Sequence, residues 1–81
     1  MTIEETYQYL LKTIHDCMPD LDVSGLNRDT RLVDTNIDSM AFMLILSKIE
    51  GNTGVHVPET EWPGIQTVGE AAEALARHMK L

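Results

Sequence analysis

The stretch "DTNIDSMAFMLILSKIE", from Asp34 to Glu50, decides the fold, because a polar turn runs directly into a long apolar segment. Seven consecutive apolar residues follow Ser39. Within this stretch one set of side chains recurs at steps of three and four, the spacing of a buried helix face: Phe42, Ile45, Leu46 and Ile49. Asp38 suits a helix cap and the sequence after Glu50 is rich in glycine, so we predict a helix from about Asp38 to Glu50.

A second apolar set lies on a different side of the same helix. Met40, Met43 and Leu44 also follow one another at steps of three and four, but the core stripe does not need them. A central helix that is packed on several sides would be apolar all round. Alternatively, flexible methionines can form a surface that binds another protein. The pattern alone does not separate these two interpretations.

Two further long helices are expected, one at each end of the chain. Apolar residues recur at helical spacing between Ile3 and Met18, after a Thr2–Glu5 pair with capping-box spacing. Pro19 ends that helix. Thr67 and Glu70 form a similar pair before the last helix. The apolar side of this helix consists of Ala71, Ala72, Leu75, Ala76 and Met79. Its last turn is basic, with Arg77, His78 and Lys80.

The connections between the helices add one short helix. Pro58 suits the start of a helical turn at Glu59–Glu61, and Pro63-Gly64 is expected to end it. The long polar segment after Pro19 contains apolar residues that we expect to pin it against the core: Leu21, Val23, Leu26, Leu32 and Val33. The predicted fold is all-α, a small antiparallel bundle of three long helices plus one short helix, in a single domain over residues 1–81.

Composition narrows the partners. The chain has 81 residues, 43% of them hydrophobic, and a net charge of −7. Because the chain is negatively charged, we do not expect it to bind nucleic acid or anionic membranes, which would repel it. A protein with a basic patch would complement its charge. The apolar run at Met40 is much shorter than the roughly 20 residues of a membrane span. The single cysteine, Cys17, and an acidic N-terminal segment without an apolar stretch indicate a cytoplasmic protein.

The sequence gives no sign of catalysis or of a metal site. Ser39 lacks the G-x-S-x-G motif of a nucleophile elbow, and so small a domain has little room for an oxyanion hole. His15, His56 and His78 fall on three different elements, which suggests neither a triad nor metal ligands. We therefore expect no catalytic residues and no metal.

The segment "DTRLVDTNIDSM" followed by an apolar helix resembles the acyl carrier protein family, whose members read broadly D-T-x-L-x-x-x-G-[hydrophobic]-D-S-L. The residues at the matching positions are Asp29, Thr30, Leu32, Ile37, Asp38 and Ser39. Met40 stands where leucine is usual and Asn36 where glycine is usual. The resemblance continues without gaps to Val68 and covers nearly the whole chain.

The resemblance implies a carrier without catalysis of its own. The serine at the position of Ser39 would hold 4'-phosphopantetheine, which a phosphopantetheinyl transferase supplies from coenzyme A, and Asp38 would be the adjacent motif residue. The thiol of that arm would carry acyl intermediates as thioesters for fatty-acid, polyketide or related specialised biosynthesis. Partners would be the transferase and the enzymes that load and receive the acyl group, and the protein is expected to be a freestanding monomer.

The charge on the predicted second helix differs from that of many fatty-acid carriers. Between Ser39 and Val57 only Lys48 and Glu50 are charged, so this stretch is formally neutral. We therefore expect partner enzymes to bind an apolar face formed by Met40, Met43 and Leu44, together with Ser47. Two alternatives stay open: an aminoacyl or aryl carrier loaded by an adenylating enzyme, and an unmodified helical module that binds a partner peptide.

Overall fold

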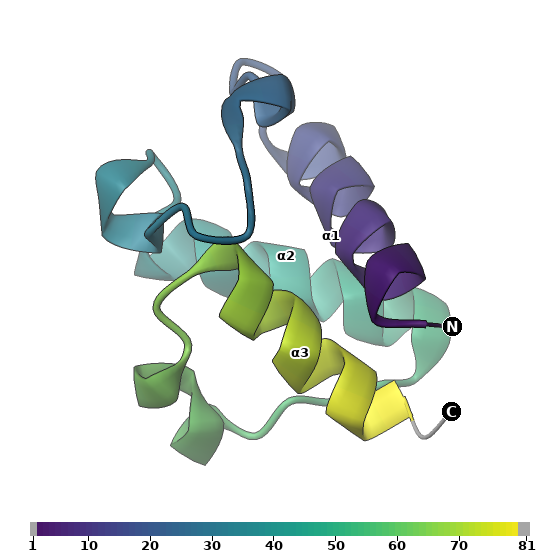
Figure 1. The fold of residues 1–81 in the computed structure, drawn as a ribbon. Coiled ribbons are helices and arrows are strands. Elements are labelled where there is room, and N and C mark those ends of the chain that lie inside the picture. Colours follow the sequence, from purple (N-terminus) through teal and green to yellow (C-terminus); the bar gives the residue numbers. More distant parts are fainter. Residues whose placement is uncertain (1, 80–81) are drawn as a thin grey trace.

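The computed structural model describes residues 2–79 and consists of three α-helices joined by short 3₁₀ turns (Figure 1). The helices are α1 (Ile3–Cys17), α2 (Ser39–Thr53) and α3 (Val68–Met79), and the turns are η1 (Val23–Gly25), η2 (Leu32–Asp34) and η3 (Glu59–Gly64). Within the described residues there is no β-strand, only an isolated bridge between Arg31 and Thr67. The prediction of a small bundle with three long helices and one short one is confirmed.

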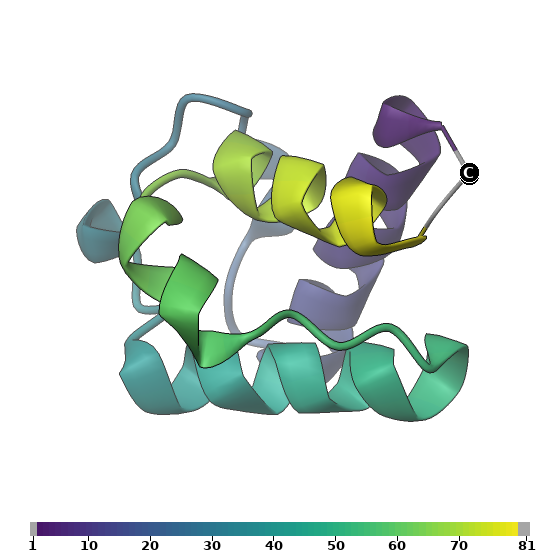
Figure 2. The same cartoon turned by 90° about the horizontal axis from the view of Figure 1, so that it is seen from below.

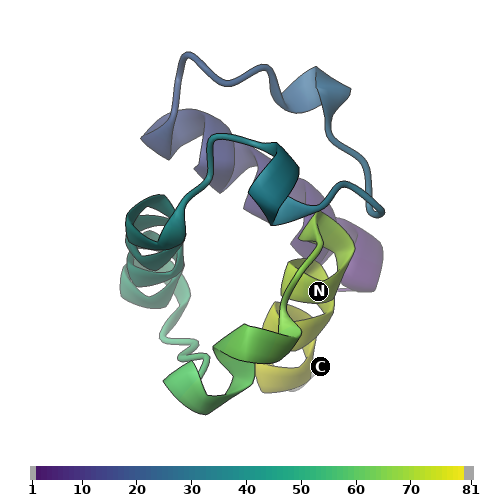
Figure 3. The same ribbon diagram turned by 90° about the vertical axis from the view of Figure 1, so that its left-hand side faces the viewer.

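The helix α1 holds the bundle together, because it packs against both α2 and α3 and crosses both of them (Figures 1 and 2). Its Leu10 and Ile14 meet Ile45 and Ile49 of α2 and Leu75 of α3 in one core, where each side chain is at most 2% exposed. After α2 the chain turns back towards the beginning of this helix to reach η3 (Figure 2). Seen from the side, η2 and η3 bridge α2 and α3 at opposite edges (Figure 3).

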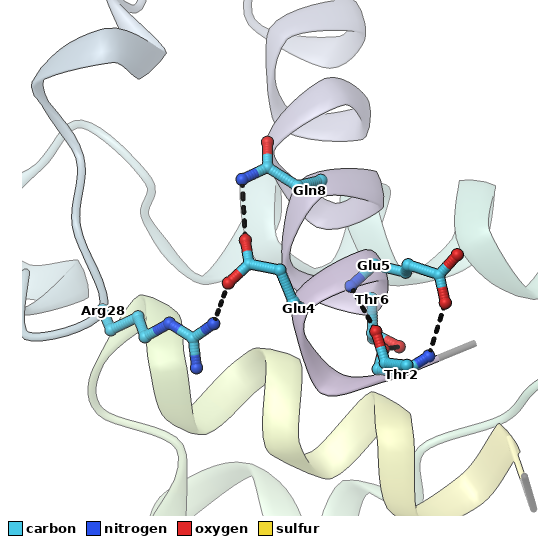
Figure 4. Close-up of polar contacts among 6 residues, drawn as sticks. All are labelled: Thr2, Glu4, Glu5, Thr6, Gln8 and Arg28. Atoms are coloured by element: carbon cyan, nitrogen blue, oxygen red, sulfur yellow. Dashed lines mark hydrogen bonds and ion pairs between the residues drawn. The ribbon is translucent and has the colours of Figure 1, made fainter.

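Both predicted capping boxes are present. The Thr2 hydroxyl accepts the N–H of Glu5 at 3.1 Å, and the Glu5 carboxylate accepts the N–H of Thr2 at 2.8 Å (Figure 4). At the start of α3, Thr67 and Glu70 make the same reciprocal pair of bonds, each 3.0 Å long. These bonds satisfy donors that have no partner within a helix. Lys80, expected in the last turn of α3, lies outside the described residues.

The long connection between α1 and α2 is fixed at Arg28. Its guanidinium pairs with Glu4 (Figure 4). The guanidinium also lies 5.0 Å from the centre of the Tyr7 ring, and the Arg28 carbonyl accepts the N–H of Gly69 at 3.0 Å. A Cβ at Gly69 would lie 2.8 Å from that carbonyl oxygen, so glycine permits this close approach. As predicted, four apolar residues of the connection pack against the core: Leu21, Val23, Leu26 and Leu32. The prediction for Val33 is wrong, because it is 77% exposed.

Two helix ends differ from prediction. The helix α2 continues through Gly51 to Thr53, because its stop is Gly54, whose left-handed backbone (φ 76°) donates its N–H to Glu50 at 2.7 Å. The turn η3 extends to Gly64 with Pro63 inside it. Glu61 within the turn and Ile65 just after it donate backbone hydrogen bonds, and proline is tolerated at a position from which no bond is donated.

Candidate functional site

Ser39 is the first residue of α2, and its side chain is exposed. Asp38 caps the helix: its carboxylate accepts the N–H of Ala41 at 2.8 Å, and its carbonyl accepts the N–H of Phe42 at 2.9 Å. No hydrogen bond is found from the Ser39 hydroxyl to another of residues 2–79. The Asp38 carboxylate is therefore engaged with the helix backbone, while the neighbouring Ser39 is exposed at the helix start.

The turn in front of Ser39 is anchored on both sides. The Thr35 hydroxyl donates to the carbonyl of Leu32 at 2.7 Å and accepts the N–H of Ile37 at 3.0 Å. Ile37 is only 5% exposed and belongs to the core. Leu32 in turn donates its N–H to Gln66, just before α3, at 2.9 Å. These contacts fix the serine relative to the beginnings of both α2 and α3.

A groove of about 680 Å³ opens beside the serine, and we call it the Ser39 groove. Its apolar walls come from η2, the turn after it, α2 and η3: Leu32, Val33, Ile37, Phe42, Trp62 and Ile65. The polar residues that line the groove are Thr35, Asp38, Ser39 and Glu59. A chain attached to Ser39 would therefore begin inside a mainly apolar groove.

A second, smaller hollow of about 150 Å³ lies further along α2. Its lining includes Met43 and Leu46 of α2, Val57 of the connection and Leu75 of α3, with Ser47 also present. Trp62 borders this hollow as well as the Ser39 groove. Trp62 is half-buried and lies at the boundary between the two cavities.

The second apolar set on α2 is uncovered. Met40 is 72% exposed, Leu44 60% and Met43 49%, and Ser47 on the same helix is also exposed. The interpretation of α2 as a central helix packed on several sides is therefore wrong. We call Met40, Met43, Leu44 and Ser47 the α2 face. Val33 of η2 lines the Ser39 groove and is 77% exposed, although the sequence had assigned it to the interior.

The three histidines belong to different parts of the chain: α1, the connection after α2, and α3. His56 places Nδ1 2.9 Å from a carboxylate oxygen of Glu50, and His78 places Nε2 2.6 Å from Glu61, whereas His15 lies on α1. Hydrogen bonds from Arg77 and then His78 lower the pKa of Glu61 below its ordinary value. Among residues 2–79 no group of three or more histidine, cysteine or acidic side chains is arranged to hold a metal ion. Nor does this part of the chain contain a helix that could cross a membrane.

Comparison with known proteins identifies the family. Residues 8–75 match the family described as "phosphopantetheine attachment site". The acyl-carrier-protein AcpK of polyketide biosynthesis from Bacillus subtilis (strain 168) is 25% identical over 93% of this chain and 92% of its own length. The acyl carrier protein MbtL of Mycolicibacterium paratuberculosis (strain ATCC BAA-968 / K-10) is 40% identical over 69% of this chain and 64% of its own.

A third relative is much longer than this chain. The non-reducing polyketide synthase Preu3 of Preussia isomera is 25% identical over 88% of the chain, but the chain spans only 3% of that synthase. The similarity therefore covers most of this chain but only a small segment of the synthase.

The start of α2 fits the cofactor that this family binds covalently, 4'-phosphopantetheine. A phosphate ester needs an accessible hydroxyl, and the N-terminus of a helix favours the negative charge of the phosphate. Ser39 has such a hydroxyl at that end, beside a groove in which an attached chain has room. Family match, helical bundle and site agree: this chain belongs to the phosphopantetheine-binding carrier proteins, the family of the acyl carrier proteins.

Proposed function

We propose that Ser39 is the residue that carries 4'-phosphopantetheine and that the protein uses this arm to hold acyl groups as thioesters. The observation that carries the proposal is the exposed Ser39 hydroxyl at the start of α2, inside the D-S motif and at the edge of a groove. Ser24 and Ser47, the other serines of the chain, lie in η1 and within α2.

The attachment is a phosphoryl transfer from coenzyme A. The Ser39 oxygen forms a new bond to the phosphorus that bears pantetheine, and the bond from that phosphorus to the adenosine bisphosphate portion breaks. The serine proton leaves to a base of the transferase, and adenosine bisphosphate is the leaving group. Once bound, the arm supplies a thiol for thioester formation.

Asp38 has a structural part in this proposal. Its carboxylate holds the first turn of α2 through Ala41, so the helix start keeps its shape while the serine is modified. The adjoining residues Thr35 and Ile37 keep the turn anchored to the core. The carrier therefore presents a fixed attachment point, and the catalytic groups belong to its partners.

We further propose that the cargo is an acyl group and that the carrier is freestanding. Two relatives are named acyl carrier proteins, and AcpK matches over nearly the whole of both chains. Among the possible pathways we favour polyketide or related specialised biosynthesis, because AcpK is named for polyketide biosynthesis. An aminoacyl or aryl carrier loaded by an adenylating enzyme is the competing assignment.

Partner enzymes are proposed to contact the α2 face. Met40 directly follows Ser39, and Met43 and Leu44 lie about one helical turn further along, so an enzyme that receives the arm must come close to them. With only Lys48 and Glu50 charged between Ser39 and Val57, apolar contact would supply most of the binding.

The experiment is incubation of the protein with coenzyme A and a promiscuous phosphopantetheinyl transferase, followed by intact-mass measurement. We expect complete conversion to a form heavier by one phosphopantetheine. An unmodified interaction module would keep its original mass. Incubating the loaded form separately with malonyl transferases and with amino-acid or aryl-acid adenylating enzymes then distinguishes the two cargo classes.

A further inference from the structure

The α2 face contains the two most exposed methionine side chains among residues 2–79. Met40 is 72% exposed and Met43 is 49% exposed, and they lie three residues apart on the same side of α2. Met40 directly follows Ser39 in the chain. Small molecules in solution can therefore reach both side chains, at the surface proposed for partner enzymes.

The other two methionines in this part of the chain have different surroundings. Met18, the C-cap of α1, and Met79, at the end of α3, are half-buried and pack against the core. The sulfur of Met79 also accepts a hydrogen bond from the Thr6 hydroxyl at 3.8 Å. A reagent in solution has less access to these two side chains than to Met40 and Met43. The chain thus contains an exposed pair and a half-buried pair that can be compared in one experiment.

A peroxide converts methionine from an apolar side chain into a polar one. The thioether sulfur attacks one oxygen of hydrogen peroxide, so that a sulfur–oxygen bond forms while the oxygen–oxygen bond breaks. The second oxygen leaves as hydroxide and becomes water by taking the proton from the first. The sulfur is oxidised by two electrons and the peroxide is reduced by two. Methionine sulfoxide reductases reverse the change: two of their thiols become a disulfide, and the sulfoxide oxygen leaves as water.

Oxidation of the exposed pair should affect binding much more than folding. In the free protein, water can solvate the sulfoxide oxygens, because both side chains are exposed. In a complex, an apolar partner surface would cover them and remove this solvation without providing a hydrogen bond, which is unfavourable. The free-energy cost therefore falls on the complex, and the free carrier stays folded.

We propose that Met40 and Met43 form a peroxide-sensitive pair, whose oxidation weakens the docking of partner enzymes and whose reduction restores it. The inference rests on the proposed function, with the arm on Ser39 and partners bound at the α2 face. Met40 stands where leucine is usual in the carrier family. Leucine would keep the apolar contact but has no sulfur that peroxide can oxidise, so methionine adds a chemical property at this position.

The test begins with the protein whose Ser39 hydroxyl is still free, so that no thiol of the arm is present during oxidation. Wild type and the double variant Met40→Leu/Met43→Leu are treated with hydrogen peroxide. Catalase then removes the peroxide, and dithiothreitol reduces reversibly oxidised Cys17. Peptide mass spectrometry measures oxidation at each methionine. The rate of loading from coenzyme A by a phosphopantetheinyl transferase, which must approach the start of α2, measures partner function.

Each protein is compared with its own untreated form, so an effect of the leucines on the basal rate does not enter the result. We expect Met40 and Met43 to be oxidised at least about threefold faster than Met18 and Met79, because access governs the reaction. Loading of oxidised wild type should fall by about tenfold at carrier concentrations below saturation, because a polar group is desolvated in the contact. The double variant should stay within about twofold of its untreated rate.

Two further measurements separate this effect from damage to the protein. Treatment with both methionine sulfoxide reductases, one for each sulfoxide epimer, should restore the wild-type loading rate. The circular dichroism spectrum should be the same before and after oxidation. A loss of helicity when only Met40 and Met43 are oxidised would overturn the proposal, because the two side chains would then support the fold.

Equal oxidation rates at all four methionines would also overturn the proposal. So would unchanged loading of wild type that carries both sulfoxides, or an equal loss of rate in the double variant, since the cause would then lie outside the α2 face. The untreated wild type tests the underlying function separately. If it gains no phosphopantetheine, the attachment at Ser39 is wrong whatever the state of the methionines, and the present proposal falls with it.

Discussion

Phe42 and Leu44 lie two residues apart on α2 and have opposite surroundings: Phe42 packs edge-on against Trp62, whereas Leu44 is 60% exposed. The apolar run from Met40 to Leu46 therefore serves two sides of the helix. One side faces the core through Ile45 and Leu46, and the other presents the α2 face to solvent. We propose that this exposed apolar face is the surface that binds partner enzymes.

Substitutions on the two sides should have very different effects on stability. Phe42→Ala is expected to lower the free energy of unfolding by about 3 kcal/mol, the lower end for phenylalanine, because the side chain is half-buried. Leu44→Asp should change it by less than about 0.5 kcal/mol, as for other surface positions. Urea unfolding of both variants checks this. If Leu44→Asp were as destabilising as Phe42→Ala, the α2 face would be core.

The same face should govern transfer of cargo. Met43→Asp and Leu44→Asp are each expected to lower the rate of acyl transfer to a partner enzyme by about tenfold or more, because a carboxylate would be desolvated in an apolar contact. Raising the salt concentration should alter the wild-type rate by less than about twofold, since the helix is formally neutral. Quenched time-course assays of acyl transfer from the loaded protein measure the rates of the variants and the salt dependence of the wild-type rate.

Thr60→Asp is the matched control for that experiment. Thr60 is exposed on η3 and is not part of the α2 face, yet the substitution introduces the same negative charge. Its transfer rate should stay near that of wild type. A loss as large as that of Leu44→Asp would mean that net charge, and not the α2 face, controls the reaction.

The two glycines at the end of α2 should respond to alanine in opposite directions. Gly51 lies inside the helix with open space where a Cβ would be, so Gly51→Ala should stabilise by about 0.5–1 kcal/mol. Gly54 has φ 76°, so Gly54→Ala should cost about 1–2 kcal/mol. Thermal melts of the two variants decide the matter, and a stabilising Gly54→Ala would contradict the left-handed cap.

Acid should weaken the contact between η3 and α3. Hydrogen bonds from Arg77 and His78 lower the folded-state pKa of Glu61, so its contribution to stability is present above its ordinary pKa of 4.5 and is lost as the pH falls below it. The Tm difference between wild type and Glu61→Gln should therefore be largest near neutral pH and shrink towards about pH 3. Asp20→Asn, the same charge change at an exposed loop position, should show a smaller difference at every pH.

The helices could be predicted because local signals and burial agree. Thr2 with Glu5 and Thr67 with Glu70 mark helix starts by spacing alone, and the core stripe of α2 repeats at helical period. The end of α2 could not be predicted from the sequence, because either Gly51 or Gly54 could stop a helix. Only the backbone conformation at Gly54 shows which of them stops the helix.

The candidate site was partly predictable. Ser39 and Asp38 follow from a motif and a cap, both of which are local. The groove is not local: it needs η2 and η3, which approach the start of α2 only after folding. Val33 was misassigned for a related reason, since its hydrophobic character suggests burial and nothing in the sequence shows that η2 turns it outward.

Localising the modification tests the central claim most directly. Wild type, Ser39→Ala and Ser47→Ala are incubated with coenzyme A and the transferase, and the products are digested and sequenced by tandem mass spectrometry. We predict one phosphopantetheine on wild type and on Ser47→Ala, in each case on the peptide position of Ser39, and none on Ser39→Ala, which should remain helical by circular dichroism. Phosphopantetheine on Ser24 or Ser47, or any on a folded Ser39→Ala, would contradict the account.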